Sequence, residues 1–272
     1  MSPDIIAAAF LAACRAELQA LKPGNVHVHA AGHGMTAADF EESALAAAPH
    51  IAERGQRVGA RILRAVTATR ARVGQNTNLG IVLLAAPLAM AAQTPGHDDL
   101  RGALRAVLAG LDREDAANCF QAIALANPGG LGDAPKQDVR GPALVTLLEA
   151  MRLAAGRDRV AYQYASGYAD IFDIGLPVAR QAGNAAEAAA AVYWRFLTTL
   201  PDSHVARKYG GSRADALLRR AQDLDAALAA APDAAARHAL LLDFDARLKA
   251  ESLNPGTSAD LTVATLFVYA LL

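Results

Sequence analysis

Residues Leu253–Leu272 read LNPGTSADLTVATLFVYALL, a short polar run that opens directly onto an apolar stretch. Here and through most of the chain, apolar residues recur at spacings of three and four, as an amphipathic helix requires. Alternating β-branched and aromatic residues, the pattern of a strand, are almost absent. The sequence therefore predicts an all-α fold, with one helix starting near Ser258.

The same spacing places helices along the rest of the chain. Thr36 is followed three residues later by Asp39, a capping pattern, and Pro142 suits a first helical turn. No Ser/Gly-rich linker or repeated unit divides the sequence, so we expect one bundle-like domain over residues 1–272. The predicted helices are roughly Asp4–Leu21, Thr36–Arg70 (broken near Pro49 and Gly55), Leu79–Ala92, Asp98–Leu111, Asp112–Ala126, Pro142–Ala155, Arg157–Gln181, Ala185–Leu200, Ser212–Ala230, Asp233–Glu251 and Ser258–Leu272.

Composition narrows the class of protein. Of 272 residues, 53% are hydrophobic and 19% are charged, which permits a sizeable core. A net charge of -1 argues against nucleic acid as a partner. The first residues carry Asp4 where a signal peptide has basic residues, and no apolar run reaches the roughly 18–20 residues of a membrane helix. We therefore expect a cytoplasmic protein with no membrane partner, in which Cys14 and Cys119 are reduced and packed.

Several segments between the predicted helices share a composition. Each contains Asn and Gly and ends where an apolar helix begins. A helix N-terminus has unpaired N–H groups and a positive dipole end, so it attracts phosphates and carboxylates. Taken singly, such a segment is ordinarily just a cap; several converging would form a pocket for a polyanion. The segments are Leu21–Met35, Gly74–Gly80, Ala126–Gly141 and Leu253–Asp260.

The first of these segments is the richest in candidate ligands. Lys22 precedes Pro-Gly, and a lysine suits a phosphate as a point charge. His27, His29 and His33 follow, but their spacing is not a standard zinc pattern. Histidines that contact solvent or phosphate are the favoured interpretation.

Two further stretches carry charged candidates. Arg207 and Lys208 stand beside two glycines and follow Asp202, either as a solvated basic turn or as a phosphate clamp. Asp260 comes three residues after Thr257, at the expected start of the last helix. Spacing alone favours a capping role for Asp260; the alternative is a catalytic base or a metal ligand.

Taken in order along nearly the whole chain, these motifs resemble those of the triphosphoribosyl-dephospho-CoA synthase family. The resemblance implies an all-helical enzyme that uses ATP and 3′-dephospho-CoA, releases adenine, and joins the triphosphoribosyl group to the acceptor ribose. It also implies Mg²⁺ for the triphosphate. The motifs are Lys22-Pro23-Gly24, His33 before Met35 and Phe40, Gly74-x-Asn76-Thr77 ending at Gly80, Asp202, and Asn254-Pro255-Gly256-x-Ser258-Ala259-Asp260-Leu261.

The resemblance implies roles for particular residues. Asp260 and Asp202 would act as base, electrostatic stabiliser or Mg²⁺ ligands, with nucleotides as the small-molecule partners. The alanine-rich face at Ala185–Ala191 suits either the core or a subunit contact, and the core is the favoured interpretation. A homodimer therefore stays possible. The residues expected to bind substrate or phosphate are Lys22, Gly24, Asn25, His33, Asn76, Thr77, Asn78, Arg207, Lys208, Asn254, Gly256, Thr257 and Ser258.

The sequence departs from the usual family motifs at several places. Asn78-Leu79 stands where characterised members read His-Lys, and Asp202-Ser203-His204 where they read Asp-Thr-Asn. Thr257 replaces the second glycine of the last motif, and segment 132–141 is similar to a divergent, archaeal or methylotroph-like branch. Two alternatives therefore stay open. One is a related ribosyl-phosphate or nucleotide-dependent enzyme of methanopterin-type one-carbon coenzyme biosynthesis; the other is a non-catalytic nucleotide-binding helical protein.

Overall fold

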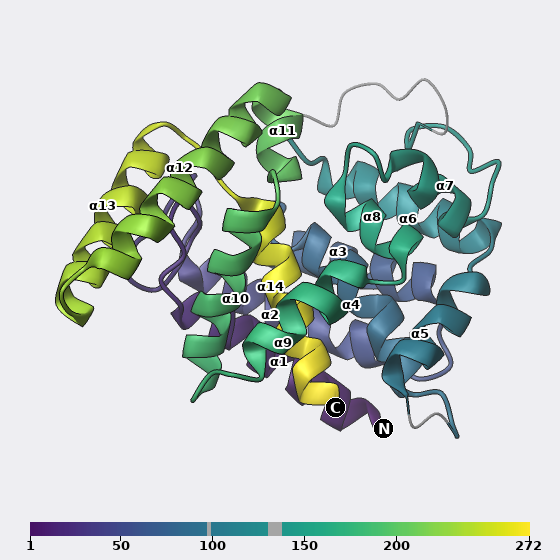
Figure 1. Cartoon of the computed structure of the whole chain (residues 1–272). Coiled ribbons are helices and arrows are strands. Elements are labelled where there is room, and N and C mark those ends of the chain that lie inside the picture. The colour runs from purple at the N-terminus through teal and green to yellow at the C-terminus, as the bar shows by residue number, and fades with distance from the viewer. Residues whose placement is uncertain (97–98, 130–137) are drawn as a thin grey trace.

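The computed structural model describes residues 1–96, 99–129 and 138–272. These residues form helices and connecting segments, with no β-strand among them, so the predicted all-α fold is confirmed. The elements, most of them labelled in Figure 1, are α1 (Pro3–Gln19), α2 (Ala37–Ala52), α3 (Val58–Val73), α4 (Leu79–Ala92), α5 (Leu100–Ala109), α6 (Arg113–Ala126), α7 (Leu147–Ala154), α8 (Arg159–Ser166), the π-helix η1 (Asp170–Gly175), α9 (Leu176–Ala179), α10 (Ala185–Thr199), α11 (Ser203–Tyr209), α12 (Gly211–Ala230), α13 (Ala234–Ala250) and α14 (Gly256–Leu271).

Helix α14 lies at the centre of the molecule (Figure 1). It packs against α1, α4, α9, α10 and η1. It is buried along most of its length, from Thr257 to Leu271. A helix surrounded by others needs no polar face, which explains why the segment that follows Asp260 is almost wholly apolar.

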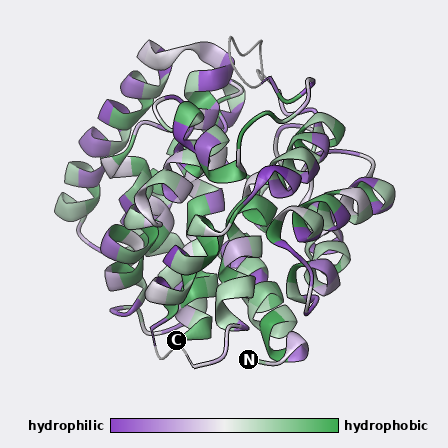
Figure 2. Ribbon diagram, turned by 90° about the vertical axis from the view of Figure 1, so that its right-hand side faces the viewer, coloured by the Kyte–Doolittle hydropathy of each residue, from purple (hydrophilic) through white to green (hydrophobic). Residues whose placement is uncertain are grey.

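Two hydrophobic clusters fill the interior. The larger one contains residues from each of the helices α1 through α10, from η1 and from α14. The smaller one lies where α10, α11 and α14 meet α12 and α13, and includes Tyr193, Leu217, Phe244 and Leu248. Figure 2 shows most helices carrying hydrophobic and hydrophilic residues together, as amphipathic helices around a core do. The α12–α13 pair, at one edge of the molecule (Figure 1), thus packs against the other helices through the smaller cluster.

Many predicted helix bounds agree with the structure. The Leu79–Ala92 helix has the predicted bounds, and the ends of α1, α5, α6, α10 and α13 lie within a few residues of those expected. The predicted break between 36 and 70 is confirmed, because α2 ends at Ala52 and α3 begins at Val58. The break falls at Gly55, whose φ is 80°, while Pro49 stays inside α2.

The helix expected to begin at Pro142 begins instead at Leu147, so that prediction is wrong. Thr146 caps it: its side chain accepts a hydrogen bond from the Glu149 N–H, and the Glu149 carboxylate accepts one from the Thr146 N–H. A reciprocal capping box fixes a helix start more firmly than a proline does.

Two other predictions about helices are also wrong. The single helix expected over 157–181 is interrupted after α8, where Gly167 and Tyr168 take left-handed backbone conformations with φ of 66° and 61°. The segment 200–212, expected as a loop, contains α11, which is capped by Asp202. The additional helix lies beside the cavity described below.

Burial agrees with the remaining expectations. Both cysteines are unpaired and buried, and burial raises the pKa of the Cys119 thiol to about 12. Ala188 and Ala189 belong to the larger hydrophobic cluster, as the core interpretation of the alanine-rich face requires. Within the described ranges, no helix is long and apolar enough to cross a membrane.

Candidate functional site

A cavity of about 820 Å³ is bounded by the N-terminal turns of α4, α8, α11 and α14 and by α6 and α7. Its volume is typical of sites for small molecules and cofactors. The helix N-termini supply N–H groups and positive dipole ends. The described polar residues of its wall are Glu17, Asn25, Asn76, Thr77, Asp138, Arg157, Asp158, Arg159, Ser203, His204, Arg207, Asn254, Thr257 and Asp260.

Asp260 contributes a carboxylate to this cavity from α14. Helix α14 begins at Gly256, without a side-chain capping bond, so Asp260 falls in the second turn and the predicted capping role is wrong. Among the described residues, no side chain or backbone group pairs with this carboxylate. Burial, together with the nearby carboxylates of Asp202 and Glu17, raises the pKa of the Asp260 carboxyl well above its ordinary value.

The first turn of α4 leaves room for this carboxylate at Gly80. A Cβ atom built on Gly80 would lie 2.0 Å from Asp260 Oδ2 and 2.5 Å from its Cγ. An ordinary contact between such atoms is about 3.5 Å. The close approach of Asp260 therefore requires glycine at position 80, which gives a physical reason for the end of that motif.

The segment before Gly80 divides its side chains between the cavity and the interior. Asn76 and Thr77 line the cavity. Asn76 Oδ1 accepts a hydrogen bond from the Leu79 N–H at 3.2 Å, and Thr77 Oγ1 lies 2.5 Å from Ser43 Oγ. Asn78, a predicted substrate ligand, is buried and donates to the Ser43 carbonyl at 3.3 Å. It fastens α4 to α2 and does not reach the cavity wall.

Lys22, the predicted phosphate ligand of the first segment, is fully buried behind the cavity wall. Its ammonium is ion-paired with Glu17 and donates to Asn25 Oδ1 at 3.0 Å. Asn25 Nδ2 donates in turn to Asn254 Oδ1 at 2.8 Å. Burial raises the pKa of Glu17 and lowers that of Lys22, and their mutual attraction opposes both changes. Since Glu17, Asn25 and Asn254 line the cavity, Lys22 holds part of its polar wall from behind.

Asp202 stabilises the starts of two helices. Its Oδ1 accepts hydrogen bonds from the N–H groups of His204 and Val205 in α11, at 3.0 and 3.1 Å. Its Oδ2 accepts from the N–H and the hydroxyl of Ser258 in α14, at 2.8 and 2.9 Å. Asp202 and Ser258 are buried and lie outside the cavity wall. The four lone-pair positions of a carboxylate are thereby occupied.

The contact between α11 and α14 places His204 at the cavity. Thr257 Oγ1 accepts from the His204 N–H at 3.0 Å and lies 3.0 Å from Ser203 Oγ. The imidazole lies against Gly256, where an added Cβ would be 2.8 Å from His204 Nδ1. Burial lowers the pKa of His204. Gly256, Thr257, Ser203 and His204 all line the cavity.

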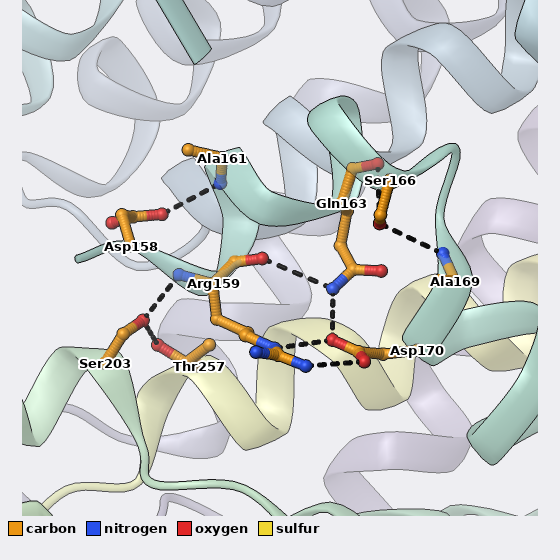
Figure 3. A network of polar contacts seen from close by, with 9 residues as sticks. All are labelled: Asp158, Arg159, Ala161, Gln163, Ser166, Ala169, Asp170, Ser203 and Thr257. Carbon is orange, nitrogen blue, oxygen red and sulfur yellow. Dashed lines mark hydrogen bonds and ion pairs between the residues drawn. The ribbon is translucent and has the colours of Figure 1, made fainter. Parts of the chain in front are cut away.

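Arginines line the α8–α11 side of the cavity, where the polar network of Figure 3 lies. Arg159 is held by Asp170 of η1 through two hydrogen bonds of 2.6 and 2.7 Å, and its N–H donates to Ser203 Oγ at 3.0 Å (Figure 3). Arg207 Nη1 donates to Asp158 Oδ2 at 3.0 Å. The wall near α8 and α11 therefore carries guanidinium groups that are each paired with a carboxylate, while the Asp260 carboxylate stands on α14 without such a partner among the described residues.

The other predicted ligands lie away from the cavity. Lys208 is exposed, and its ammonium lies 5.2 Å from the centre of the Tyr209 ring. His33 Nε2 is 2.8 Å from the Gly24 carbonyl oxygen. Gly24 has a φ of 84°, and its N–H donates to Asp245 Oδ1 at 2.8 Å. His33 and Gly24 thus shape the first segment and anchor it to α13.

Sequence reasoning missed several residues of the cavity wall. Asp158 caps α8 through the Ala161 N–H, a pattern that a search for N-caps within the expected helix could have found. Arg159 directly follows the Asp158 cap, and His204 lies two residues after the Asp202 cap. Glu17 gave no local signal, because its partner Lys22 lies beyond the end of α1.

The described acidic side chains do not form a Mg²⁺ site of their own. Within the described part of the chain, no group of three or more His, Cys, Asp or Glu residues is placed to hold a metal ion. Asp202 has both oxygens occupied and Glu17 is paired with Lys22. A protein-held Mg²⁺ would need several oxygen ligands in octahedral geometry, which Asp260 alone does not provide.

Comparison with known proteins shows the family of the chain and a solved structure of similar fold. The sequence profile of the ATP:dephospho-CoA triphosphoribosyl transferase family matches residues 3–272. No curated protein matches the chain. A crystal structure from Archaeoglobus fulgidus, of a protein proposed to be a triphosphoribosyl-dephospho-CoA synthase, is 24% identical with a TM-score of 0.63, over 83% of this chain and 95% of that one. That likeness supports the fold, and the profile match shows the family. The chain belongs to the ATP:dephospho-CoA triphosphoribosyl transferase family.

Proposed function

We propose that this transferase binds ATP in the cavity, displaces adenine, and joins the triphosphoribosyl group to a ribose hydroxyl of dephospho-CoA. We also infer that residues 1–272 form one transferase domain. The observation that carries the proposal is the Asp260 carboxylate. It faces a nucleotide-sized cavity, has no partner among the described residues, and is accommodated by a glycine on α4.

The chemistry calls for an acidic group beside the sugar. Breaking the bond between adenine and ribose builds positive charge on the ribose ring, as in other glycosyl transfers. A carboxylate placed close to that ring stabilises the charge in a site that excludes water. A carboxyl group with a raised pKa is also suited to exchange protons near neutral pH. The raised pKa of Asp260 supports the second of these roles.

The triphosphate would lie toward the α8–α11 side of the cavity. Arg159 and Arg207 line this side beside the N-termini of α8 and α11, whose positive dipole ends favour anions. This arrangement replaces the predicted contact with Lys22, which we assign to holding Glu17 and Asn25 in position. Asn76, Thr77 and Asn254 remain candidates for contacts to ribose or phosphate oxygens, since all three line the cavity.

The other end of the cavity is apolar. Phe120 and Ile123 of α6 and Leu147 and Met151 of α7 line it. These side chains suit the uncharged parts of the substrates, the adenine ring or the pantetheine arm. Mg²⁺ bound to the triphosphate would neutralise phosphate charge. We place its ligands on the phosphates, because the described carboxylates and histidines form no cluster that holds the ion by itself.

One observation favours a second candidate, a related enzyme that acts on a methanopterin-type coenzyme intermediate. Leu79 lines the cavity and is buried at the position where the resembling motif usually carries lysine. An apolar wall at this point would favour an acceptor with less negative charge. The choice between the two acceptors can be tested directly.

The test is release of adenine from ATP in the presence of Mg²⁺. Release that depends on dephospho-CoA supports the first proposal, and release only with a methanopterin-type acceptor supports the second. ATP binding without release, whatever the acceptor, contradicts both and indicates a non-catalytic nucleotide-binding protein. Asp260→Asn should reduce turnover by about 10²- to 10⁴-fold with the fold intact. The matched control, Asp223→Asn at an exposed position of α12, should leave turnover unchanged.

A further inference from the structure

His204 has a fixed backbone and an imidazole without a protein partner. Its N–H donates to Asp202 Oδ1 and to Thr257 Oγ1, both at 3.0 Å, so α11 and α14 together fix its position. The ring lines the cavity. Within the described residues, no group forms a hydrogen bond or ion pair with either ring nitrogen. The structure therefore fixes the residue and leaves the two nitrogen atoms available to a ligand.

The imidazole of His204, from α11, lies on the same face of α14 as the Asp260 carboxyl group. The ring of His204 lies against Gly256, where an added Cβ would be 2.8 Å from Nδ1. Gly256 and Asp260 are four residues apart and both line the cavity, so they lie one above the other on the helix. The separation along the helix axis is about 6 Å. A sugar ring bound against this face would have an imidazole near one end and a carboxyl group near the other.

The charges around the two groups favour opposite protonation states. Burial lowers the pKa of His204; Arg207, Lys208 and His33 act in the same direction and Asp202 opposes them. Burial raises the pKa of Asp260; the carboxylates of Asp202, Glu17 and Asp158 act in the same direction and Arg207 opposes them. The lowered pKa of His204 favours the neutral imidazole, which can accept a proton, and the raised pKa of Asp260 favours the protonated carboxyl group, which can give one.

We propose that His204 is a second catalytic residue of this site, which takes the proton of the attacking hydroxyl while Asp260 protonates the departing adenine. The proposal rests on the proposed function. It assigns the base role to a histidine and gives Asp260 the role of acid.

The step balances in atoms and electrons. The hydroxyl oxygen forms a bond to the anomeric carbon of the ribose, and the bond from that carbon to the adenine nitrogen breaks. Its electron pair leaves with adenine. The hydroxyl proton passes to a ring nitrogen of His204, and the carboxyl proton of Asp260 passes to adenine. Transfer of one proton through solvent from the imidazolium to the Asp260 carboxylate restores both groups.

The pH dependence of adenine release distinguishes this role from simple packing against Gly256. The wild type should show a bell-shaped profile, because His204 must be neutral and Asp260 protonated. In His204→Asn the maximal rate should fall about 10²- to 10⁴-fold and the low-pH limb should disappear, with ATP affinity and Tm close to wild type. His238→Asn, at an exposed position of α13, is the matched control and should keep the full rate and both limbs.

Rescue provides a second measurement. Added imidazole should restore part of the rate of His204→Ala, since the vacated space opens to the cavity, and should not restore Asp260→Asn. A His204→Asn protein that keeps the low-pH limb or the full rate overturns the role of His204 and leaves the proposed function intact. A wild type that releases no adenine with any acceptor overturns the proposed function and this inference together.

Discussion

Gly80→Ala is the most direct test of the contact between α4 and Asp260. The added methyl carbon would lie 2.0 Å from Asp260 Oδ2. An ordinary contact is about 3.5 Å, so the carboxylate must move by about 1.5 Å. Misplacing a catalytic group by about 1 Å can cost about 10²-fold in rate. We therefore expect turnover to fall by about 10²-fold or more, which corresponds to about 2.7 kcal/mol.

The same substitution should not destabilise the protein. Gly80 lies in the first turn of α4 without a left-handed φ, and alanine is favoured over glycine in a helix by up to about 1 kcal/mol. The displaced carboxylate has no partner to lose among the described residues. We expect the Tm to stay within about 4 °C of the wild-type value, on the usual scaling for a domain of this size.

The assay is steady-state adenine release together with thermal denaturation of each variant. Gly110→Ala is the matched control, because the nearest atoms to its added Cβ are 3.6 Å away and its φ is -88°. In an Asp260→Asn background, Gly80→Ala should produce no further loss of rate, since both changes act through one group. A Gly80→Ala protein with wild-type turnover would refute the placement of Asp260 at the reaction centre.

Two further predictions concern stability. Asp202→Ala removes four hydrogen bonds at the starts of α11 and α14 and should lower the free energy of unfolding, measured by urea denaturation, by about 2–4 kcal/mol. The control Asp233→Ala removes a single cap from α13 and should lower it by about 1 kcal/mol. Equal losses in the two variants would contradict the double role of Asp202. Asp260 has a raised pKa in the folded protein, so the wild type should lose stability as pH rises from the unfolded value of about 3.9 through the folded one. The Tm of Asp260→Asn, relative to that of the wild type, should therefore rise across this pH range and then level off. A Tm difference between the two proteins that is constant with pH would contradict the raised pKa of the Asp260 carboxyl group.

The sequence predicted the long helices well, because their apolar spacing extends over many turns. The predictions of helix boundaries were wrong where one or two residues determine the start or the end of a helix. Thr146 starts α7 because its capping box with Glu149 outweighs the proline that precedes it. Left-handed conformations at Gly167 and Tyr168 end α8 within a stretch whose apolar pattern continues. Tyr168 gives no hint of this conformation, since a non-glycine residue seldom adopts it.

The sequence predicted that several helix starts would converge on one pocket, but it identified fewer of the residues that line the pocket. Helix starts with Asn and Gly do converge, and Asp260, Asn76 and Arg207 line the cavity. Lys22 could not be placed correctly, because its ion pair with Glu17 buries it behind the wall. Asp202 likewise looks catalytic in the sequence but is fully occupied by two helix starts that come together only in the fold.

The central position of α14 has a consequence for how the protein is made. Ribosomes deliver the chain from the N-terminus, so α1, α4 and α10 emerge before the helix that covers their apolar faces. Until α14 is synthesised, these faces have no native partner at the centre of the bundle, and an incomplete chain exposes them to other chains. Folding of the larger core must therefore wait until α14 has been synthesised.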